Sequence, residues 1–325
     1  MEGLSQILVL ALFMLAGALL PRLRVRGRPL APPPRAVDLV LKLVLRALLL
    51  LMGFRIGNDG GLSARLAEIG LLGACAGLLA TAGSLAALLA AFALLGPRVR
   101  RIPAAASVLD PGARPVAPAR PSLARRLKEP AALVSFVAAG FLLGLVLPGA
   151  TGIDIAALGS WILDALLFLI GMQFSQSGVS LKGAFLEPAV LVVPLATAAG
   201  TLGAGLLLAP LFGLGAGKAL ALVGGFGWYS LSGVLIADLG DPALGSAAFL
   251  ANMARELLAL LSIPFLSRSA LPQLAIGVGG ATAMDVTLPL IEEGAGPGIV
   301  PASFASGALL SLAVPLIVPL FYRLG

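Results

Sequence analysis

The sequence predicts an all-α polytopic membrane protein with about eight transmembrane helices plus two interrupted or re-entrant segments, arranged as inverted repeats. Three observations support this fold class. The 325 residues are 59% hydrophobic and 11% charged, about half the charge of a typical soluble domain. Apolar runs of roughly 18 residues or more, long enough to span a bilayer, recur along the whole chain. Two similar segments late in the chain place glycines and polar residues where a continuous helix is expected.

Each predicted span is an apolar run between charged, proline or glycine residues. The first run begins with Glu2 and has no basic segment before it, which favours a first span over a cleaved signal peptide. The predicted spans are 5–21, 40–58, 66–95, 131–148, 155–175, 185–213, 244–266 and 299–321. Two further apolar pieces, 218–239 and 271–291, contain polar interruptions. If both of these pieces cross the membrane, the alternative is ten spans with two broken crossing helices.

Basic residues predict the orientation of the chain in the membrane. More than half of the 22 lysines and arginines lie in residues 22–35 and in the proline-rich stretch 97–130. Because such clusters mark the cytoplasmic side, we expect 97–130 to be a cytoplasmic linker and both termini to lie outside. The recurring apolar spans predict a multi-pass membrane location. Aromatic residues do not interleave with the arginines, so the net charge of +7 points to the lipid bilayer and not to nucleic acid.

The reactive residue types exclude several function classes. The chain has no histidine, and Cys75 is its single cysteine, so the sequence predicts neither an intramolecular disulfide nor a metal cluster. A phosphate-binding lysine motif is also absent, which argues against ATP as the energy source. With no catalytic constellation in the sequence, we expect a protein that is not an enzyme and that needs no cofactor.

A first internal repeat divides most of the chain into two units within a single transmembrane domain, 1–325. With a shift of 118 residues, RALLLLMGFRIGNDG (46–60) aligns with DALLFLIGMQFSQSG (164–178). The repeat defines two three-helix units, 1–96 and 131–213. Since successive spans alternate in direction, these units are predicted to be inverted relative to each other.

A second repeat covers the rest of the chain, 214–325. With a shift of 55 residues, GGFGWYSLS (224–232) aligns with GGATAMDVT (279–287). Each copy is an interrupted segment followed by a helix. If each interrupted segment returns to its own side, these two units are inverted as well; if each crosses, they are parallel.

The paired interruptions are the predicted substrate site. In inverted-repeat transporters, discontinuous helices meet near the bilayer midplane and hold the substrate or coupling ion with their freed backbone groups. Glycine-mediated helix packing is the alternative, but it does not explain polar residues that recur in register. For Trp228 and Tyr229, a position as an aromatic pair at the membrane interface is a further alternative. The candidate side chains at the breaks are Trp228, Tyr229, Ser230, Ser232, Asp285 and Thr287.

Charged residues within apolar segments are further candidates, because each costs about 2.5–3.5 kcal/mol at the centre of a span. Arg255 and Glu256 lie in an apolar helix, and Asn252 is on a nearby face. Adjacent helical residues point apart, so the two charges need different partners. One hypothesis pairs Arg255 with Asp285, which leaves Glu256 to bind a proton or a cation. A structural ion pair with neighbouring helices is the alternative.

Asp59 is the candidate acid of the first repeat. It ends the second predicted span in GFRIGNDGG and aligns with Ser177 of the other copy. Both residues are included in the predicted binding or coupling set. The alternative for Asp59 is a solvated loop acid that pairs with Arg65 or caps a helix.

Four stretches of the chain closely resemble the LysO-type lysine exporters of bacterial inner membranes. They are GFGWYSLSG (225–233), GSAAFLANMARELLALLSIP (245–264), GGATAMDVTLP (279–289) and VPASFASGALLSLAVPL (300–316). The resemblance covers about 160–325, and LLMGFRIGND (50–59) is similar to a further span of the family.

The resemblance implies export of L-lysine, and of analogues such as thialysine, driven by an ion gradient. It also implies that intramembrane acids are central to transport, with Asp285 matching one and Asp59 the other. Protons are the expected coupling partner, with another cation as an alternative, and a homodimer is compatible with the sequence. Two rival functions stay open: a sodium or other cation/proton antiporter, and a membrane scaffold without transport activity.

Overall fold

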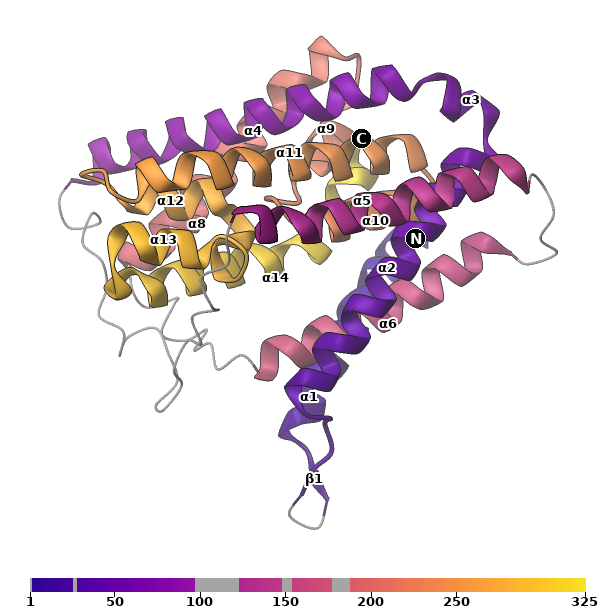
Figure 1. The fold of residues 1–325 in the computed structure, drawn as a ribbon, viewed down its shortest axis with the longest axis horizontal. Helices are drawn as coiled ribbons and strands as arrows, with labels where there is room; N and C mark the ends of the chain where they lie inside the picture. The colour runs from indigo at the N-terminus through magenta and orange to yellow at the C-terminus, as the bar shows by residue number, and fades with distance from the viewer. Residues whose placement is uncertain (1, 26–27, 97–122, 148–153, 177–187) are drawn as a thin grey trace.

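The computed structural model describes residues 1–325 except 1, 26–27, 97–122, 148–153 and 177–187 (Figure 1). The described chain is helical apart from one pair of two-residue antiparallel strands, β1 (Arg24–Val25) and β2 (Arg28–Pro29). Eight long helices correspond to the eight predicted spans: α1 (Glu2–Leu19), α2 (Pro34–Asn58), α4 (Leu66–Leu95), α5 (Leu123–Val146), α6 (Ile155–Gln176), α8 (Pro188–Leu211), α11 (Pro242–Leu266) and α14 (Val300–Leu324). The prediction of an all-α polytopic membrane protein is confirmed.

Two helices begin well before their predicted spans. Helix α2 begins at Pro34, before the predicted start at residue 40, because a proline suits the first turn of a helix and the charged residues that follow are tolerated there. Helix α5 begins at Leu123, inside the stretch assigned to the linker. Short helices fill the connections: η1 (Leu20–Arg22) follows α1, α3 (Gly60–Ala64) follows α2, and η4 (Pro297–Ile299) precedes α14.

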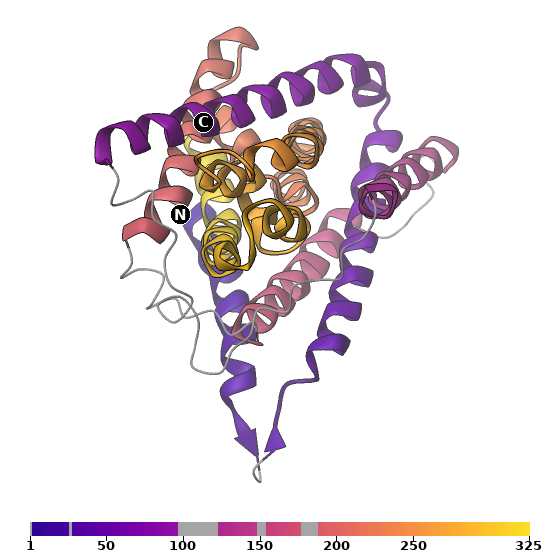
Figure 2. The same ribbon diagram turned by 60° about the vertical axis from the view of Figure 1, so that its left-hand side comes forward.

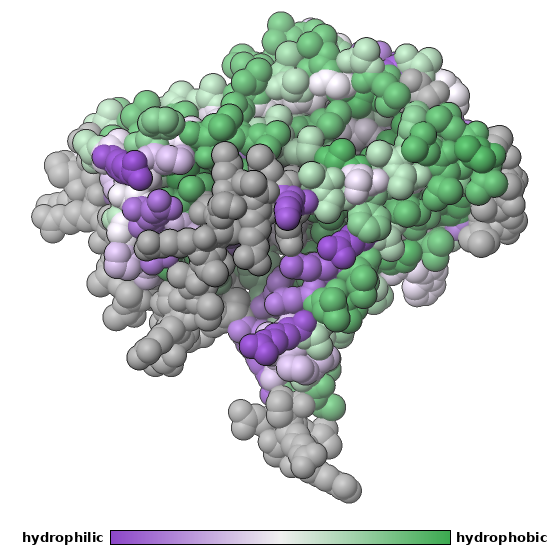
Figure 3. Space-filling model, in the orientation of Figure 1, coloured by the Kyte–Doolittle hydropathy of each residue, from purple (hydrophilic) through white to green (hydrophobic). Residues whose placement is uncertain are grey.

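Length and composition agree with a membrane location. Within the described residues, five helices are long and apolar enough to cross a bilayer, namely those at Leu66–Leu95, Ala157–Gln176, Val190–Leu211, Pro242–Leu266 and Pro297–Leu324. Hydrophobic residues cover much of the outer surface along α4 (Figure 3). On that helix Leu71, Leu78 and Leu94 are 60%, 55% and 85% exposed. Leucines exposed to this extent along a whole helix are suited to contact with lipid.

Both predicted interruptions are present. The first segment consists of α9 (Ala216–Val223) and α10 (Tyr229–Asp238). The second consists of α12 (Gln273–Gly279), a 3₁₀ turn η3 (Gly280–Met284) and α13 (Leu288–Ala295). At a rise of 1.5 Å per residue, none of these helices is longer than about 15 Å, roughly half the hydrocarbon thickness.

The first repeat shows in the way the helices pair. Helix α1 packs against α6, and its repeat equivalent α5 packs against α2, the equivalent of α6. The closest approaches are equivalent too. A side chain on Gly171 would collide with the Met14 carbonyl of α1, and one on Gly53 would collide with the Val137 carbonyl of α5. The first helix of each unit therefore packs against the second helix of the other unit, as a two-fold relation between the units requires.

The directions of these helices agree with inversion. Gly53 meets Val137 and Gly57 meets Phe141, so α2 and α5 run parallel. Figure 2 shows α1 and α2 running in opposite directions from the β1–β2 turn. Helix α5 therefore opposes its repeat equivalent, α1.

The third helices of the two units, α4 and α8, pack against each other at Gly83 and Gly200, where each glycine touches the carbonyl of the other. The interrupted segments and α11 and α14 pack together inside the frame formed by the remaining helices (Figure 2). The largest cluster of buried residues includes Leu231 and Leu235 of α10, Ala247 and Ala251 of α11 and Val314 of α14. This core fixes the interrupted segments relative to the frame.

Candidate functional site: the crossing of two interrupted helices

The first break, GGFGW at 224–228, reverses the backbone between α9 and α10. Phe226 has φ +48°, the one positive φ among the non-glycine residues described, and Gly227 has φ +99°. A non-glycine residue in this region is strained and is retained only where the surroundings hold it. The Trp228 amide donates to the Gly225 carbonyl at 2.7 Å, which closes the turn immediately before α10 begins.

The second break, between α12 and α13, is held by two threonines. Gly280 has φ +60° and opens the 3₁₀ turn. The Thr282 hydroxyl donates to the Gly279 carbonyl at 2.9 Å, and the Thr287 hydroxyl donates to the Thr282 carbonyl at 3.0 Å. Thr287 is fully buried, and its amide donates to the same Thr282 carbonyl at 3.0 Å, so both of its donors close the second break.

The two breaks touch each other, and we call the place where they meet the crossing. The Ala281 amide of the second break donates to the Phe226 carbonyl of the first at 2.9 Å. A side chain on Gly280 would collide with the same carbonyl, so only glycine permits this approach. The prediction that two interrupted stretches meet inside the protein agrees with this contact.

Asn252 of α11 organises the first break. Its side-chain oxygen accepts from the Gly227 amide at 2.8 Å. Its amide nitrogen contacts the carbonyls of Leu222 and Ala248 at 3.3 and 2.9 Å and the Ser232 hydroxyl at 3.1 Å. Asn252 is 2% exposed, so the side chain replaces the hydrogen bonds that a continuous helix would have made.

Arg255 lies one turn further along α11, beside both breaks, and is 1% exposed. Its Nη1 donates to the Thr201 hydroxyl of α8 at 2.7 Å, and its Nη2 donates to the Gly277 carbonyl of α12 at 3.1 Å. Its Nε has no hydrogen-bond partner among the described residues. No described carboxylate lies within 4.0 Å of the guanidinium, so the hypothesised ion pair with Asp285 is not formed in this structure.

The other predicted side chains at the breaks are mostly buried. Glu256 is 2% exposed, Ser230 4% and Ser232 0%, while Trp228 is half-buried. Tyr229 packs edge-to-face on Phe249 of α11, with ring centroids 5.3 Å apart, which favours a place in the core over a place at the membrane interface.

The two predicted aspartates lie apart from each other. Asp285 is exposed, and its Oδ1 accepts from the Val286 amide at 2.6 Å. Asp59 is also exposed and ends α2, where its Oδ1 accepts from the Gly61 amide at 2.9 Å. Helices α3 and α13, which adjoin them, lie at opposite ends of the long axis (Figure 1). Arg65 pairs with Glu68 at 2.8 Å, and Ser177 lies outside the described residues.

Comparison with known proteins bears directly on this crossing. The family model described as Lysine exporter LysO matches residues 134–322, more than half of the chain. The chain belongs to the LysO family. It is 39% identical to the Lysine exporter LysO of Escherichia coli (strain K12), over 62% of this chain and 67% of that protein. It is 34% identical to the Putative lysine exporter of Haemophilus influenzae (strain ATCC 51907 / DSM 11121 / KW20 / Rd), over 50% and 82%. No solved structure matches.

The LysO family match contains both interrupted segments and the helices α11 and α14 that follow them. The residues that form the crossing, from Phe226 to Thr287, therefore lie within the family region. Helices α1, α2 and α4 precede it. Asp59, at the end of α2, is outside the matched range, whereas Asn252, Arg255 and Asp285 are inside it.

One polar cluster of this LysO family member was not anticipated from the sequence. Arg55 of α2 donates to the Ala237 carbonyl at 3.0 Å and the Ile155 carbonyl at 3.3 Å, and its Nη2 is 4.0 Å from Asp238. Ser160 of α6 donates to Asp238 at 3.1 Å. The cluster ties α2 and α6 to the end of α10. The sequence contained a signal for this cluster, because Asp238 lies at the end of an interrupted segment and Arg55 lies within a predicted span.

Thr201 and Gly277 were also missed as partners of Arg255. Thr201 was visible as a polar residue within an otherwise apolar run. The Gly277 contact uses a backbone carbonyl, for which side-chain patterns give no signal.

Proposed function

We propose that this protein is a secondary active exporter of L-lysine, and of analogues such as thialysine, in the bacterial inner membrane, with both termini outside. Membership of the LysO family and the names of its relatives support the substrate. The observation that carries the site is the contact between two interrupted helices beside a buried arginine without a carboxylate partner among the described residues. Inverted-repeat transporters place their substrate at such breaks.

The crossing offers chemistry suited to an amino acid. Lysine carries a carboxylate and two ammonium groups, so its site needs a donor for the first and oxygens for the others. The spare Nε–H of Arg255 is a buried donor for the carboxylate. Glu256 and Asp285 supply acidic oxygens for the ammonium groups, and backbone carbonyls at the breaks add neutral acceptors.

Proton entry is the proposed driving reaction. Export of a cation against the membrane potential costs about 2.3 kcal/mol per charge for each 100 mV. One-to-one exchange of lysine for an entering proton moves no net charge and removes this cost. A carboxylate that binds either the proton or the substrate ammonium couples the two movements by competition. Glu256, which is buried, and Asp285, which is exposed, are the proposed coupling acids.

Flux measurements in proteoliposomes test the proposal. We expect lysine movement to follow an imposed pH gradient and to be lost in the Glu256→Gln and Asp285→Asn variants. Glu68→Gln, which removes an exposed acid outside the crossing, is the matched control and should retain transport. Lysine flux that is indifferent to the pH gradient would reject proton coupling.

The same vesicles separate the rival functions. A lysine exporter moves protons when lysine is added, whereas a cation/proton antiporter moves protons when sodium is added. A scaffold responds to neither. Proton movement with sodium and none with lysine would replace the proposed function with antiport.

A further inference from the structure

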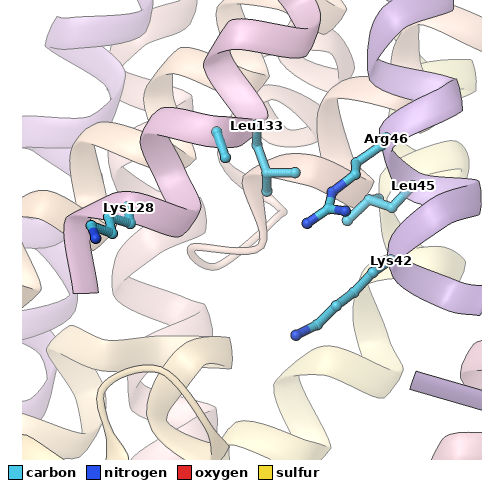
Figure 4. A pocket seen from close by; sticks show the side chains of 6 residues that line it. Lys42, Leu45, Arg46, Lys128 and Leu133 are labelled. Carbon is cyan, nitrogen blue, oxygen red and sulfur yellow. The ribbon is translucent and has the colours of Figure 1, made fainter. Parts of the chain in front are cut away.

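A groove between α2 and α5 lies apart from the crossing. Its cavity is about 250 Å³ and is lined by Lys42, Leu45, Arg46, Lys128, Ala132 and Leu133 (Figure 4). Lys42 and Arg46 extend from α2 into the space facing α5 (Figure 4). The two helices run parallel and are in close contact further along, at Gly53 and Gly57, so the groove is an opening between helices that are otherwise tightly packed.

The charge of the groove selects an anion. Half of the six lining residues are basic, and none is acidic. Lysine, with a net charge of +1, is repelled by such a lining, so the groove is unsuited to the substrate proposed above. Leu45, Ala132 and Leu133 supply an apolar wall beside the cations. A ligand that fits both surfaces has an anionic group and a hydrophobic part.

Arg46 is arranged to receive an anionic group. Its guanidinium lies over the ring of Phe136 of α5, with Cζ 5.7 Å from the ring centroid. This stacking holds the side chain across the groove. Its Nε is buried and has no hydrogen-bond partner among the described residues. Guanidinium groups bind phosphate through two parallel N–H donors, so an unsatisfied donor at this position favours a phosphate oxygen.

The position along the helices fits the cytoplasmic leaflet. Helix α2 begins at Pro34, after the basic stretch that the sequence places on the cytoplasmic side. At 1.5 Å per residue, Lys42 lies about 12 Å along the helix and Arg46 about 18 Å, within reach of the headgroup region for long side chains. Leu39 and Leu43 on the same helix are 60% and 54% exposed, which suits contact with an acyl chain.

We propose that this groove binds a phosphate group, held by Arg46, Lys42 and Lys128. The apolar wall and the exposed leucines favour the phosphate of an anionic lipid in the cytoplasmic leaflet, because basic pockets between transmembrane helices bind such headgroups. Free inorganic phosphate has the same charged chemistry and is the second source to be tested. The inference is independent of the transported substrate.

Lipid retention tests the groove. The full-length protein is purified in nanodiscs of phosphatidylcholine doped with phosphatidylglycerol, and bound lipid is counted by native mass spectrometry. Each basic residue near an anionic surface is worth roughly fivefold in affinity, so Lys42→Gln/Arg46→Gln should weaken phosphatidylglycerol binding about 30-fold. Arg22→Gln/Arg268→Gln removes two exposed cations outside the groove and should bind like the unaltered protein.

A second arm separates the two sources. Inorganic phosphate is titrated onto the protein in pure phosphatidylcholine nanodiscs. Saturable binding of phosphate alone, lost in the double variant, would assign the groove to the free anion. Retention of phosphatidylglycerol without phosphate binding would assign it to lipid. If the groove variant and the control retain both ligands equally, the proposal is overturned.

A third arm does not depend on the folding of a variant. The unaltered protein is irradiated in nanodiscs that contain phosphatidylglycerol with a photoactivatable headgroup, and the labelled peptides are sequenced. Labelling should concentrate within residues 42–46 and 128–133. Labelling spread over the basic surface, with no excess in these peptides, would also overturn the proposal.

Discussion

The amide of Ala281 donates a 2.9 Å hydrogen bond to the carbonyl of Phe226, and the two residues occupy equivalent positions in the second repeat. The surroundings are equivalent too. Asn252 of α11 holds the first break. Its equivalent 55 residues later is Gly307 of α14, which lies against the Met284 amide and the Ala281 carbonyl of the second break. Contact between equivalent residues is expected close to a two-fold axis. The two breaks therefore form one shared structure, in which a change to one shifts the other.

Gly280→Ala should destabilise the protein more than alanine at other glycines. The new Cβ would meet the Phe226 carbonyl, and φ is +60°, so the change combines a collision with backbone strain and should cost about 2–4 kcal/mol. Gly240→Ala, at φ +99° in open space, carries strain alone and should cost about 1 kcal/mol. Gly298→Ala has neither feature. Thermal unfolding in detergent measures the order, and an equal effect for all three would show that the breaks do not depend on close contact.

Asn252→Ala should loosen the first break. The change removes the acceptor of the Gly227 amide and the donor to the Leu222 carbonyl in a buried place, where each unsatisfied group costs about 1–3 kcal/mol. We expect a lower unfolding temperature together with a loss of lysine flux. Ser262→Ala on the same helix is the control, because among the described residues its hydroxyl bonds only the Leu258 carbonyl one turn back. If lysine flux survives in Asn252→Ala, transport does not need the first break to be held in this form.

Arg255→Met should reduce transport without reducing stability. A buried guanidinium with no carboxylate partner among the described residues is itself costly to the fold, so an apolar replacement of similar length should leave the unfolding free energy unchanged or raise it by about 1 kcal/mol. Lysine flux should fall at least about tenfold, because a substrate carboxylate loses its donor. Arg65→Met removes an exposed ion pair and should alter neither property. A large loss of stability in Arg255→Met would instead make the arginine a structural clamp between α8 and α12.

The sequence was sufficient to locate both breaks but not the partners around them. Glycines and polar residues recurring at 224–232 and 279–287 predicted interruptions, and the structure has them at 224–228 and 280–287. Local pattern is enough here, because the paired glycines that open each copy weaken a continuous helix. The partner of Arg255 depends on which helices surround α11. Thr201 and the Gly277 carbonyl come from α8 and α12, and no spacing along the chain relates them to Arg255.

The sequence was likewise sufficient to select the candidate acids but not to fix their burial. Asp59 and Asp285 were selected because charge is costly within apolar segments, but both lie at helix ends, where their carboxylates accept nearby amides. Glu256 was selected by the same rule and is buried. Sequence alone does not fix the depth of an acid near a helix end, because a shift of one turn moves it about 5 Å.

Equivalent glycines of the first repeat should respond equally to substitution. Gly53→Val and Gly171→Val each place a side chain against a backbone carbonyl of the partner helix, Val137 in one pair and Met14 in the other. A carbonyl moves only with its helix, so each change should spread its pair and cost about 1–3 kcal/mol. Gly70→Val on α4, where nothing lies within 4 Å, is the control and should have little effect. If only one of the two variants loses stability, the two three-helix units do not contribute equally to the stability of the frame. The two-fold relation would then describe their ancestry but not their present packing.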